Sequence, residues 1–191
     1  MSERSNKTAV FIDGSNLHAA AQMIGMDIDF RKVLDFFRAK YDLVRAYYYT
    51  SILADEDGYA GLNKLVDWLD FNGFTVVSKE AKQFVDANGR SRVKGCMDVE
   101  LAVDVMNMAD RVDEIVIFSG DGNLRYLIEA VQRKGVKVTI ISTKETNPPV
   151  AAESIRRQAD EFIDLTALRP LIDKTFTAES SARHVKSWRS S

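Results

Sequence analysis

Cysteine, histidine and long apolar runs are scarce in this sequence. Its 191 residues include one cysteine, Cys96, and two histidines, His18 and His184. The single cysteine excludes an internal disulfide and a multi-cysteine zinc site, and two histidines leave little for a histidine-based metal site. No apolar stretch approaches the roughly 20 residues of a membrane span, and the start MSERSNK does not look like a signal peptide. We therefore expect a cytoplasmic protein without a membrane segment.

Strong charge of either sign is also missing, because the net charge is −2 at pH 7. The whole chain is thus no general polyanion binder, and any contact with nucleic acid would come from local patches. With 46% hydrophobic residues, the length fits one domain with a real core. We expect a disordered N-terminus at residues 1–6, a domain at 7–173 and a flexible basic tail at 174–191.

Short apolar, β-branched runs alternate with amphipathic stretches of helical period, which is typical of a parallel sheet covered on both faces. The pattern predicts an α/β fold with a doubly wound, mainly parallel sheet of about five or six strands. Strands are expected at residues 9–12, 44–49, 75–77, 115–118 and 136–141, with a short addition at 162–165. Helices are expected at residues 30–40, 59–71, 98–108, 124–133 and 150–158.

Two predicted strands run directly into an aspartate. VFIDGSN places Asp13 after a buried run, and VIFSGDGN places Asp121 after another. Each alone fits ordinary turn chemistry or helix capping. In a doubly wound sheet, however, these two strands are neighbours at the switch point, so their carboxylates should converge there. Asp98, expected to open the helix after the third strand and its hairpin, supplies a third acid.

Carboxylates that meet in one crevice repel one another unless a cation lies between them. Oxygen ligands without cysteine or clustered histidine select Mg²⁺ or Mn²⁺ over zinc. Mg²⁺ uses few carboxylates and completes its coordination with water and substrate phosphates, which indicates phosphodiester or phosphoryl chemistry. Small polar residues on the same loops are expected to hold metal-bound water or a phosphate oxygen: Ser15, Asn16 and Ser119.

Asp104 is a weaker candidate. It follows Asp98 by six residues, which places it about 120° away around a helix axis, so the two side chains do not share a face. We expect Asp104 to have a supporting role at most.

The segment before Asp98 contains an Asn-Gly pair at 88–89, a strong tight-turn signal between stretches that could form a hairpin. Most charged segments of this kind are solvated surface hairpins. The position of this segment beside Asp98 also suits a clamp for an anionic substrate. The cations on this hairpin are Lys82, Arg90, Arg92 and Lys94.

Three longer stretches carry a family resemblance. They are VFIDGSNL at the first strand, KGCMDVELAVDVM at the middle helix and VIFSGDGNLRYLIEAVQRKGVKV from the fourth strand to the fifth. Together they resemble the NYN domains of the PIN-like nuclease superfamily, and more narrowly its LabA/DUF88-like bacterial branch, over residues 7–172. The resemblance implies a PIN-like, Rossmann-like three-layer α/β/α sandwich, an acidic cluster that binds Mg²⁺ or Mn²⁺, and cleavage of RNA.

The resemblance assigns roles residue by residue. Asp13 matches the first-strand acid of the family, and Asn16 matches the polar residue of that loop. Asp98 matches the acid at the middle helix, and Asp104 matches a frequent second acid there. Asp121 matches the first acid of an S-G-D-x-D-F signature.

Asn123 departs from this signature, because it stands where the family usually has a second aspartate, and Leu124 replaces the phenylalanine. An amide still offers a carbonyl oxygen to a metal but no charge, so Asn123 should weaken cation binding. The change at Leu124 favours natural divergence over a single engineered substitution.

The resemblance therefore implies a Mg²⁺- or Mn²⁺-dependent ribonuclease that hydrolyses single-stranded or structured RNA. Its catalytic acids would be Asp13, Asp98 and Asp121, with Asn123 as a further metal ligand. The hairpin cations and Arg125 would neutralise flanking phosphates. An RNA-binding or regulatory protein whose activity is weakened or lost through Asn123 is the main alternative. A homodimer fits a small domain that must grip a long substrate, and no small organic cofactor is expected.

Two other classes share parts of the pattern. A metal-dependent adhesion module of the von Willebrand A type requires Asp-x-Ser-x-Ser after its first strand, and Leu17 occupies the second serine position, so this class is a remote alternative. Haloacid-dehalogenase phosphatases need a second aspartate two residues after the first, where this sequence has Ser15. That difference argues against an aspartyl-phosphate nucleophile.

Overall fold

The structure is a computed structural model that describes residues 6–53, 59–85 and 91–176, and of residues 53, 59–63, 82–85 and 91–94 it describes only the backbone. Most of the predicted N-terminal segment and the predicted tail from residue 177 on lie outside these ranges. Residues 174–176 contact the domain, since Lys174 Nζ lies 2.9 Å from Asp27 Oδ1 and Lys32 Nζ donates to the carbonyl of Phe176. Within the described ranges, no helix has the length and apolar character that crossing a membrane requires.

Strands and helices alternate along the chain. The strands are β1 (Lys7–Asp13), β2 (Asp42–Leu53), β3 (Phe74–Val85), β4 (Ser91–Lys94), β5 (Glu114–Phe118), β6 (Lys137–Ser142) and β7 (Glu161–Asp164). The helices are α1 (Gly14–Met23), α2 (Phe30–Lys40), α3 (Tyr59–Phe71), α4 (Asp98–Met108), α5 (Arg125–Gln132), α6 (Glu153–Gln158) and α7 (Leu165–Ile172). A single 3-10 turn, η1 (Gly122–Leu124), precedes α5.

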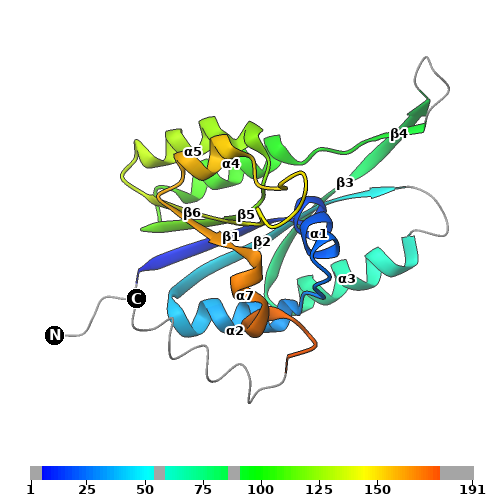
Figure 1. The fold of residues 1–191 in the computed structure, drawn as a ribbon, viewed down its shortest axis with the longest axis horizontal. Coiled ribbons are helices and arrows are strands. Elements are labelled where there is room, and N and C mark those ends of the chain that lie inside the picture. The colour runs from blue at the N-terminus through cyan, green and yellow to red at the C-terminus, as the bar shows by residue number, and fades with distance from the viewer. Residues whose placement is uncertain (1–5, 54–58, 86–90, 177–191) are drawn as a thin grey trace.

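The sheet has the strand order β4-β3-β2-β1-β5-β6-β7. β1 pairs in parallel with β2 on one side and with β5 on the other, so the winding direction reverses at β1. This order confirms the doubly wound α/β fold and brings the carboxyl ends of β1 and β5 side by side (Figure 1). β4 pairs antiparallel with β3, which confirms the backbone of the predicted hairpin. The Asn-Gly turn at 88–89 lies outside the described residues.

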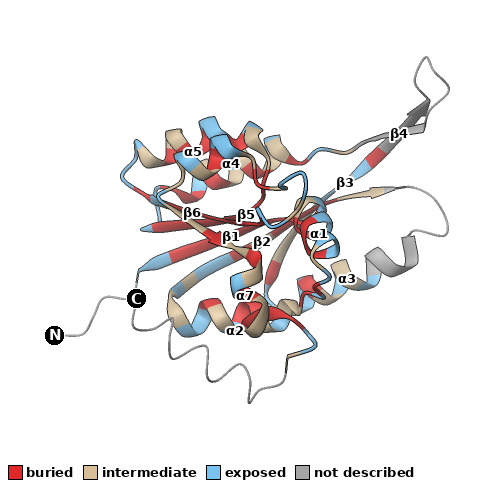
Figure 2. Cartoon of the chain, in the orientation of Figure 1, coloured by how far each residue is buried: buried red, intermediate tan, exposed pale blue. Residues whose placement is uncertain are grey.

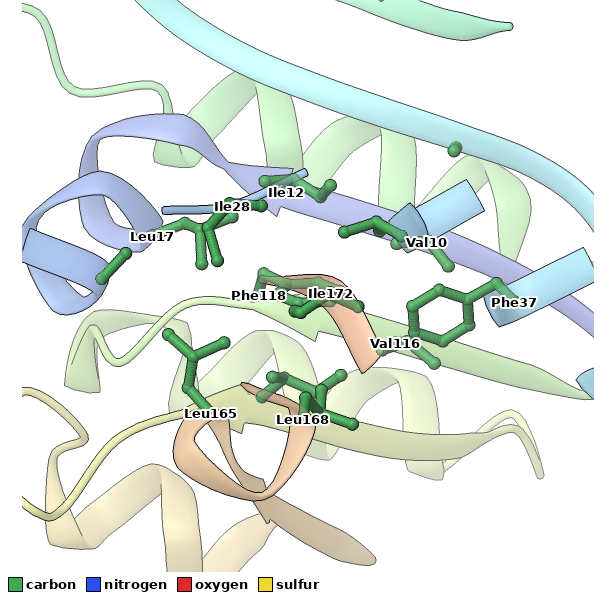
Figure 3. Packing of buried hydrophobic residues seen from close by; sticks show 14 of the residues in the cluster. Val10, Ile12, Leu17, Ile28, Phe37, Val116, Phe118, Leu165, Leu168 and Ile172 are labelled. Atoms are coloured by element: carbon green, nitrogen blue, oxygen red, sulfur yellow. The ribbon is translucent and has the colours of Figure 1, made fainter. Parts of the chain in front are cut away.

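Helices cover both faces of the sheet and complete three layers (Figure 1). α1, α2, α3 and α7 lie on one face, and α4, α5 and α6 lie on the other. β1 contributes to both cores because alternate side chains of a strand point to opposite faces. Val10 and Ile12 pack in the first core, where Figure 3 shows them, and Ala9 and Phe11 pack in the second. β1 is therefore buried from Thr8 to Asp13, as the central strands in Figure 2 show.

Two helices of the structure, α1 and α7, are not predicted by the sequence pattern. α1 begins with Gly-Ser-Asn, residues that favour turns, and α7 contains Pro170 within its eight residues. Both helices are stabilised by packing on the sheet, which outweighs local propensity. Ser15 and Asn16, expected in a loop, consequently lie in the first turn of α1.

The loop before α6 packs closely against the loop after β5. The Ala152 amide donates to the carbonyl of Gly120 at 2.9 Å, which keeps this segment extended, so the helix expected from residue 150 begins only at Glu153. A Cβ atom on Gly120 would lie 2.5 Å from the carbonyl oxygen of Val150 and 2.7 Å from Ser142 Oγ. Glycine therefore permits the close approach of these two loops.

We expect the substitution Gly120→Ala to lower the free energy of unfolding by about 1–3 kcal/mol, because the new methyl group must push the Val150 backbone away. Urea unfolding of both proteins measures this difference. Gly122→Ala is the matched control, since its Cβ would approach only the rotatable Ser154 hydroxyl, at 3.0 Å, and the Ala152 methyl, at 3.2 Å. Equal losses in the two variants would contradict the steric explanation.

Candidate functional site

Asp13 ends β1 and caps α1. Its backbone is extended, with φ −72° and ψ 100°, and its Oδ1 atom accepts the Asn16 amide at 3.1 Å. An aspartate at this position satisfies a free amide of the first turn and suits the positive end of the helix dipole. Helix capping thus accounts for an acid directly after a buried strand.

Burial distinguishes Asp13 from an ordinary helix cap, because only 9% of the residue is exposed. Besides the Asn16 amide, the Ser15 hydroxyl donates to Oδ1 at 2.8 Å and the Ser119 hydroxyl donates to Oδ2 at 3.3 Å. Desolvation raises the pKa of Asp13 above its usual value, and the charge of Asp98 adds to this rise, while the three donors oppose it. A buried carboxylate with a raised pKa is a functional-site candidate.

Ser119 and Asn16 connect the end of β1 to the loop after β5. Ser119, 1% exposed, donates to Asp13 and accepts the Asp121 amide at 3.2 Å. The Oδ1 atom of Asn16 accepts the Gly120 amide at 2.7 Å. These contacts fix the two strand ends relative to each other, whereas a role of either side chain in holding water or phosphate stays a prediction.

Asp121 repeats the capping arrangement after β5. As the N-cap of η1, it accepts the Asn123 amide on Oδ1 at 2.8 Å, and its Oδ2 atom lies 3.5 Å from Asn123 Nδ2. The second contact is long for a hydrogen bond and correspondingly weak. An aspartate at position 123 would place a second negative charge beside Asp121, whereas the amide offers it a donor. Asn123 therefore reduces the need of Asp121 for a cation.

Asp98 lies half-buried in the first turn of α4, where the helix dipole favours a negative charge. Its charge contributes to the raised pKa of Asp13. Partial burial and contact with Asp98 also raise the pKa of the Cys96 thiol, with a further contribution from the charge of Asp121. The structure thus brings Asp98 within electrostatic reach of Asp13, and brings Asp98 and Asp121 within reach of Cys96.

Within the described residues, no three His, Cys, Asp or Glu side chains are grouped closely enough to hold a metal ion. The predicted acids therefore form no ready-made metal cage. The donors present at the two strand ends are carboxylate, amide and hydroxyl oxygens, which suit a hard cation better than zinc. This donor chemistry fits Mg²⁺ or Mn²⁺.

Asp104 binds a tyrosine of the neighbouring strand. The hydroxyl of Tyr49 donates to Asp104 Oδ2 at 2.9 Å, and burial together with this carboxylate raises the pKa of Tyr49. Tyr49 is fully buried and stacks with Tyr47 against Phe11 of β1. Asp104 thus connects α4 to β2, and its supporting role in the site stays a prediction.

Among the predicted RNA-binding cations, the side chain of Arg125 alone is described. It is exposed at the start of α5, directly after η1. Arg90 lies outside the described residues. For Lys82, Arg92 and Lys94 only the backbone on β3 and β4 is described, with Lys82 paired opposite Lys94. The hairpin clamp accordingly stays a prediction.

β7 also ends in an aspartate, Asp164, which is not among the predicted site residues. Burial acts to raise the pKa of Asp164, but the amides of Lys144 and Thr166 and the hydroxyls of Thr166 and Thr143 outweigh it, so the pKa is lowered. The stretch EFID before α7 repeats the VFID of β1, and this repeat is the signal that locates it. Asp164 caps α7 as Asp13 caps α1, but its hydrogen bonds outweigh its burial. The pKa of Asp164 is therefore lowered, whereas that of Asp13 is raised.

The raised pKa of Asp13 predicts that Asp13→Asn increases the free energy of unfolding at neutral pH. The pKa of Asp13 is higher in the folded protein than in the unfolded chain, so Asp13 destabilises the fold as the pH rises from the unfolded pKa through the folded pKa. An asparagine does not titrate and avoids this cost. Asparagine also caps helices well. Urea unfolding followed from neutral pH down to about pH 3, below the ordinary pKa of an aspartate, should show a gain that disappears at the acidic end.

Asp164→Asn is the matched control with the opposite sign. The pKa of Asp164 is lowered, so its contribution to stability is present above the unfolded pKa and is lost as pH falls through the folded pKa. The variant should be less stable than the parent at neutral pH, and the two should become equal in acid. A loss of stability in Asp13→Asn at neutral pH would contradict the cost assigned to burying Asp13.

Comparisons with known proteins place this geometry in a family. The chain is similar to the low amplitude and bright protein LabA of Synechococcus elongatus, with 35% identity over 179 residues that cover 92% of each chain. It is also similar in fold to a protein of unknown function from Vibrio parahaemolyticus, at a TM-score of 0.68 and 24% identity, over 86% of this chain and 96% of that one. The NYN domain model matches residues 7–168, which include both capped strand ends and α4. The chain belongs to the NYN domain family.

Proposed function

We propose that this protein is a Mg²⁺- or Mn²⁺-dependent ribonuclease that hydrolyses RNA phosphodiester bonds at the carboxyl ends of β1 and β5. The observation that carries the proposal is the Asp13 carboxylate, which is buried with a raised pKa and faces the charge of Asp98. An uncharged asparagine would cap α1 without the cost of burying a charge, so a working state that binds a cation is the best explanation of the carboxylate. Membership of the NYN family and the family resemblance of the sequence support the same reaction.

Asp13, Asp98 and Asp121 would hold the cation, with the carbonyl oxygen of Asn123 as a neutral ligand once its side chain turns away from Asp121. Water and phosphate oxygens would complete the coordination, as Mg²⁺ prefers. When bound, the cation would supply an activated water and stabilise charge on the phosphate and the leaving oxygen.

The protein's own contacts would prepare the crevice for substrate. The Asn16 amide and the Ser15 and Ser119 hydroxyls orient Asp13 before any ligand arrives. The hydrogen bond from Gly120 to Asn16 sets the separation of the two strand ends. Exposed Arg125, beside η1, would neutralise a phosphate that flanks the scissile bond.

A second function, RNA binding without efficient cleavage, is favoured by one contact. Asn123 donates its backbone amide to Asp121 and places its side-chain amide near the other carboxylate oxygen. This arrangement lowers both the charge and the ligand capacity of the site. The affinity for RNA would then survive while turnover is weak.

The two functions differ in their response to substitutions at Asp13 and Asn123. We expect the protein to cleave labelled single-stranded or hairpin RNA with Mn²⁺ or Mg²⁺ and to lose this activity in EDTA. Asp13→Asn should lower the rate by at least about 100-fold, in line with removal of a principal electrostatic group. Asn123→Asp should raise the rate and lower the metal concentration at half-maximal activity. Gel-based cleavage assays measure each effect.

The outcomes separate the proposals. Activity only in Asn123→Asp would establish a disabled site and favour the RNA-binding function. Absence of metal-dependent cleavage from both the parent and Asn123→Asp would overturn the nuclease proposal. Cleavage that persists in Asp13→Asn would assign the activity to another site or to a contaminant, and Asp164→Asn controls for the loss of a capping aspartate remote from the crevice.

A further inference from the structure

A cavity of ≈ 480 Å³ lies on the α1 face of the sheet, between α1, the segment leading into α2, and α3. Its volume falls in the range of about 300–1,000 Å³ that is usual for small-molecule sites. The walls are mainly apolar and aromatic, with contributions from Leu17, Ala21, Ile28, Phe30 and Trp68. None of these residues belongs to the acidic crevice described above.

Tyr48 places a polar group in the wall of this cavity. The residue is 4% exposed, and its ring packs edge-on against Phe30 with 5.4 Å between the ring centroids. In the described part of the chain, no residue forms a hydrogen bond with its hydroxyl. Burial, with the charge of Asp13, raises the pKa of Tyr48 to about 12, so the hydroxyl is a donor at neutral pH. Because Tyr48 lines the cavity, a ligand atom bound there can accept a hydrogen bond from this hydroxyl.

The cavity is adjacent to the acidic crevice. Gly14, which directly follows Asp13, lines the cavity, and a Cβ atom at that position would lie 2.6 Å from the Tyr48 hydroxyl oxygen. These short distances show that the Tyr48 ring packs directly against Gly14, the residue next to Asp13. A group bound beside Tyr48 in the cavity therefore lies close to the end of β1, where it could be covalently linked to a phosphate held at Asp13.

The polar groups around the cavity match a planar heterocycle better than an aliphatic ligand. His18 and Gln22 are exposed on α1 at its edge, and the Arg31 guanidinium lies 5.8 Å from the centre of the Trp68 ring. Two nearby acids already have partners, since Asp27 pairs with Lys174 and Asp29 caps α2. Aromatic walls and hydrogen-bond donors are the usual surroundings of a nucleobase, and Arg31, which does not line the cavity, lies against the Trp68 ring, which does.

We propose that this cavity binds a nucleobase of the RNA strand whose phosphate lies at Asp13. The base stacks in the aromatic part of the cavity and accepts a hydrogen bond from the Tyr48 hydroxyl. This inference rests on the proposed function, because it takes the crevice to be an RNA phosphate site. It adds that the bound base determines which phosphate of the RNA strand lies at Asp13.

Fluorescence of Trp68 tests the proposal directly. The chain has two tryptophans, so Trp188→Phe leaves Trp68 as the sole one. In EDTA, which prevents cleavage, AMP, GMP, CMP, UMP and RNA hexamers are titrated into this variant. We expect saturable quenching by RNA and by one or more nucleotides, and none by ribose 5-phosphate, which carries the phosphate without a base.

Three variants locate the bound base. Tyr48→Phe should weaken affinity by about 2- to 10-fold, the loss expected for one hydrogen bond. Gln22→Phe, which adds a ring at the edge of the cavity, should abolish quenching. Met23→Phe is the matched control, because Met23 is 53% exposed on the same helix and does not line the cavity; its affinity should not change. Circular dichroism confirms that each variant is folded.

The results distinguish this inference from the proposed function. Nucleotide quenching that depends on Tyr48 and Gln22, in a protein that cleaves no RNA, would support the cavity and overturn the nuclease proposal. Metal-dependent cleavage that is unchanged in Gln22→Phe, together with no quenching by nucleotides or RNA, would support the nuclease and overturn the cavity. Equal quenching by ribose 5-phosphate, or equal binding by Gln22→Phe and the parent, would also overturn it.

Discussion

The buried carboxylate of Asp13 is the constraint on which the rest of the site depends. β1 is buried on both faces, so an acid at its end loses most of its hydration. Three donors replace that hydration: the Asn16 amide and the Ser15 hydroxyl come from the first turn of α1, and the Ser119 hydroxyl comes from the loop after β5. The start of α1 and the loop after β5 are therefore both connected to one charge.

Much of the fold follows from the sequence because it depends on local patterns. Apolar β-branched runs locate β1, β5 and β6, and the strand order confirms that β1 and β5 are neighbours. The helices α1 and α7 cannot be predicted from local patterns, since α1 begins with turn-forming residues and α7 contains Pro170. Their stability comes from burial against the sheet, which no short window of sequence records. The prediction that α6 begins at residue 150 is wrong because of another contact that is remote in sequence. The carbonyl of Gly120 accepts the Ala152 amide and holds the segment before α6 extended.

The site is predictable in position but not in detail. Asp13 and Asp121 are recognisable because one ends β1 and the other follows the end of β5 by three residues, at the switch point of the sheet. Their roles as helix caps, the Ser119 hydroxyl between them and the bond from Gly120 to Asn16 depend on side-chain geometry across two loops. The contact of Asp104 with Tyr49 joins residues 55 positions apart. Periodicity could show only that Asp104 faces away from Asp98; it could not identify the tyrosine on that side.

The two carboxylate oxygens of Asp13 accept different hydrogen bonds. Oδ1 accepts from the backbone amide of Asn16 and from the Ser15 hydroxyl, whereas among the described residues only the Ser119 hydroxyl donates to Oδ2, in the longest of the three contacts. A hydroxyl can rotate and find another acceptor, but a helix amide cannot move without unwinding its turn. A ligand that approaches through Oδ2 can therefore exchange partners with Ser119 while α1 stays intact, so the fold and the chemistry of this aspartate need not compete.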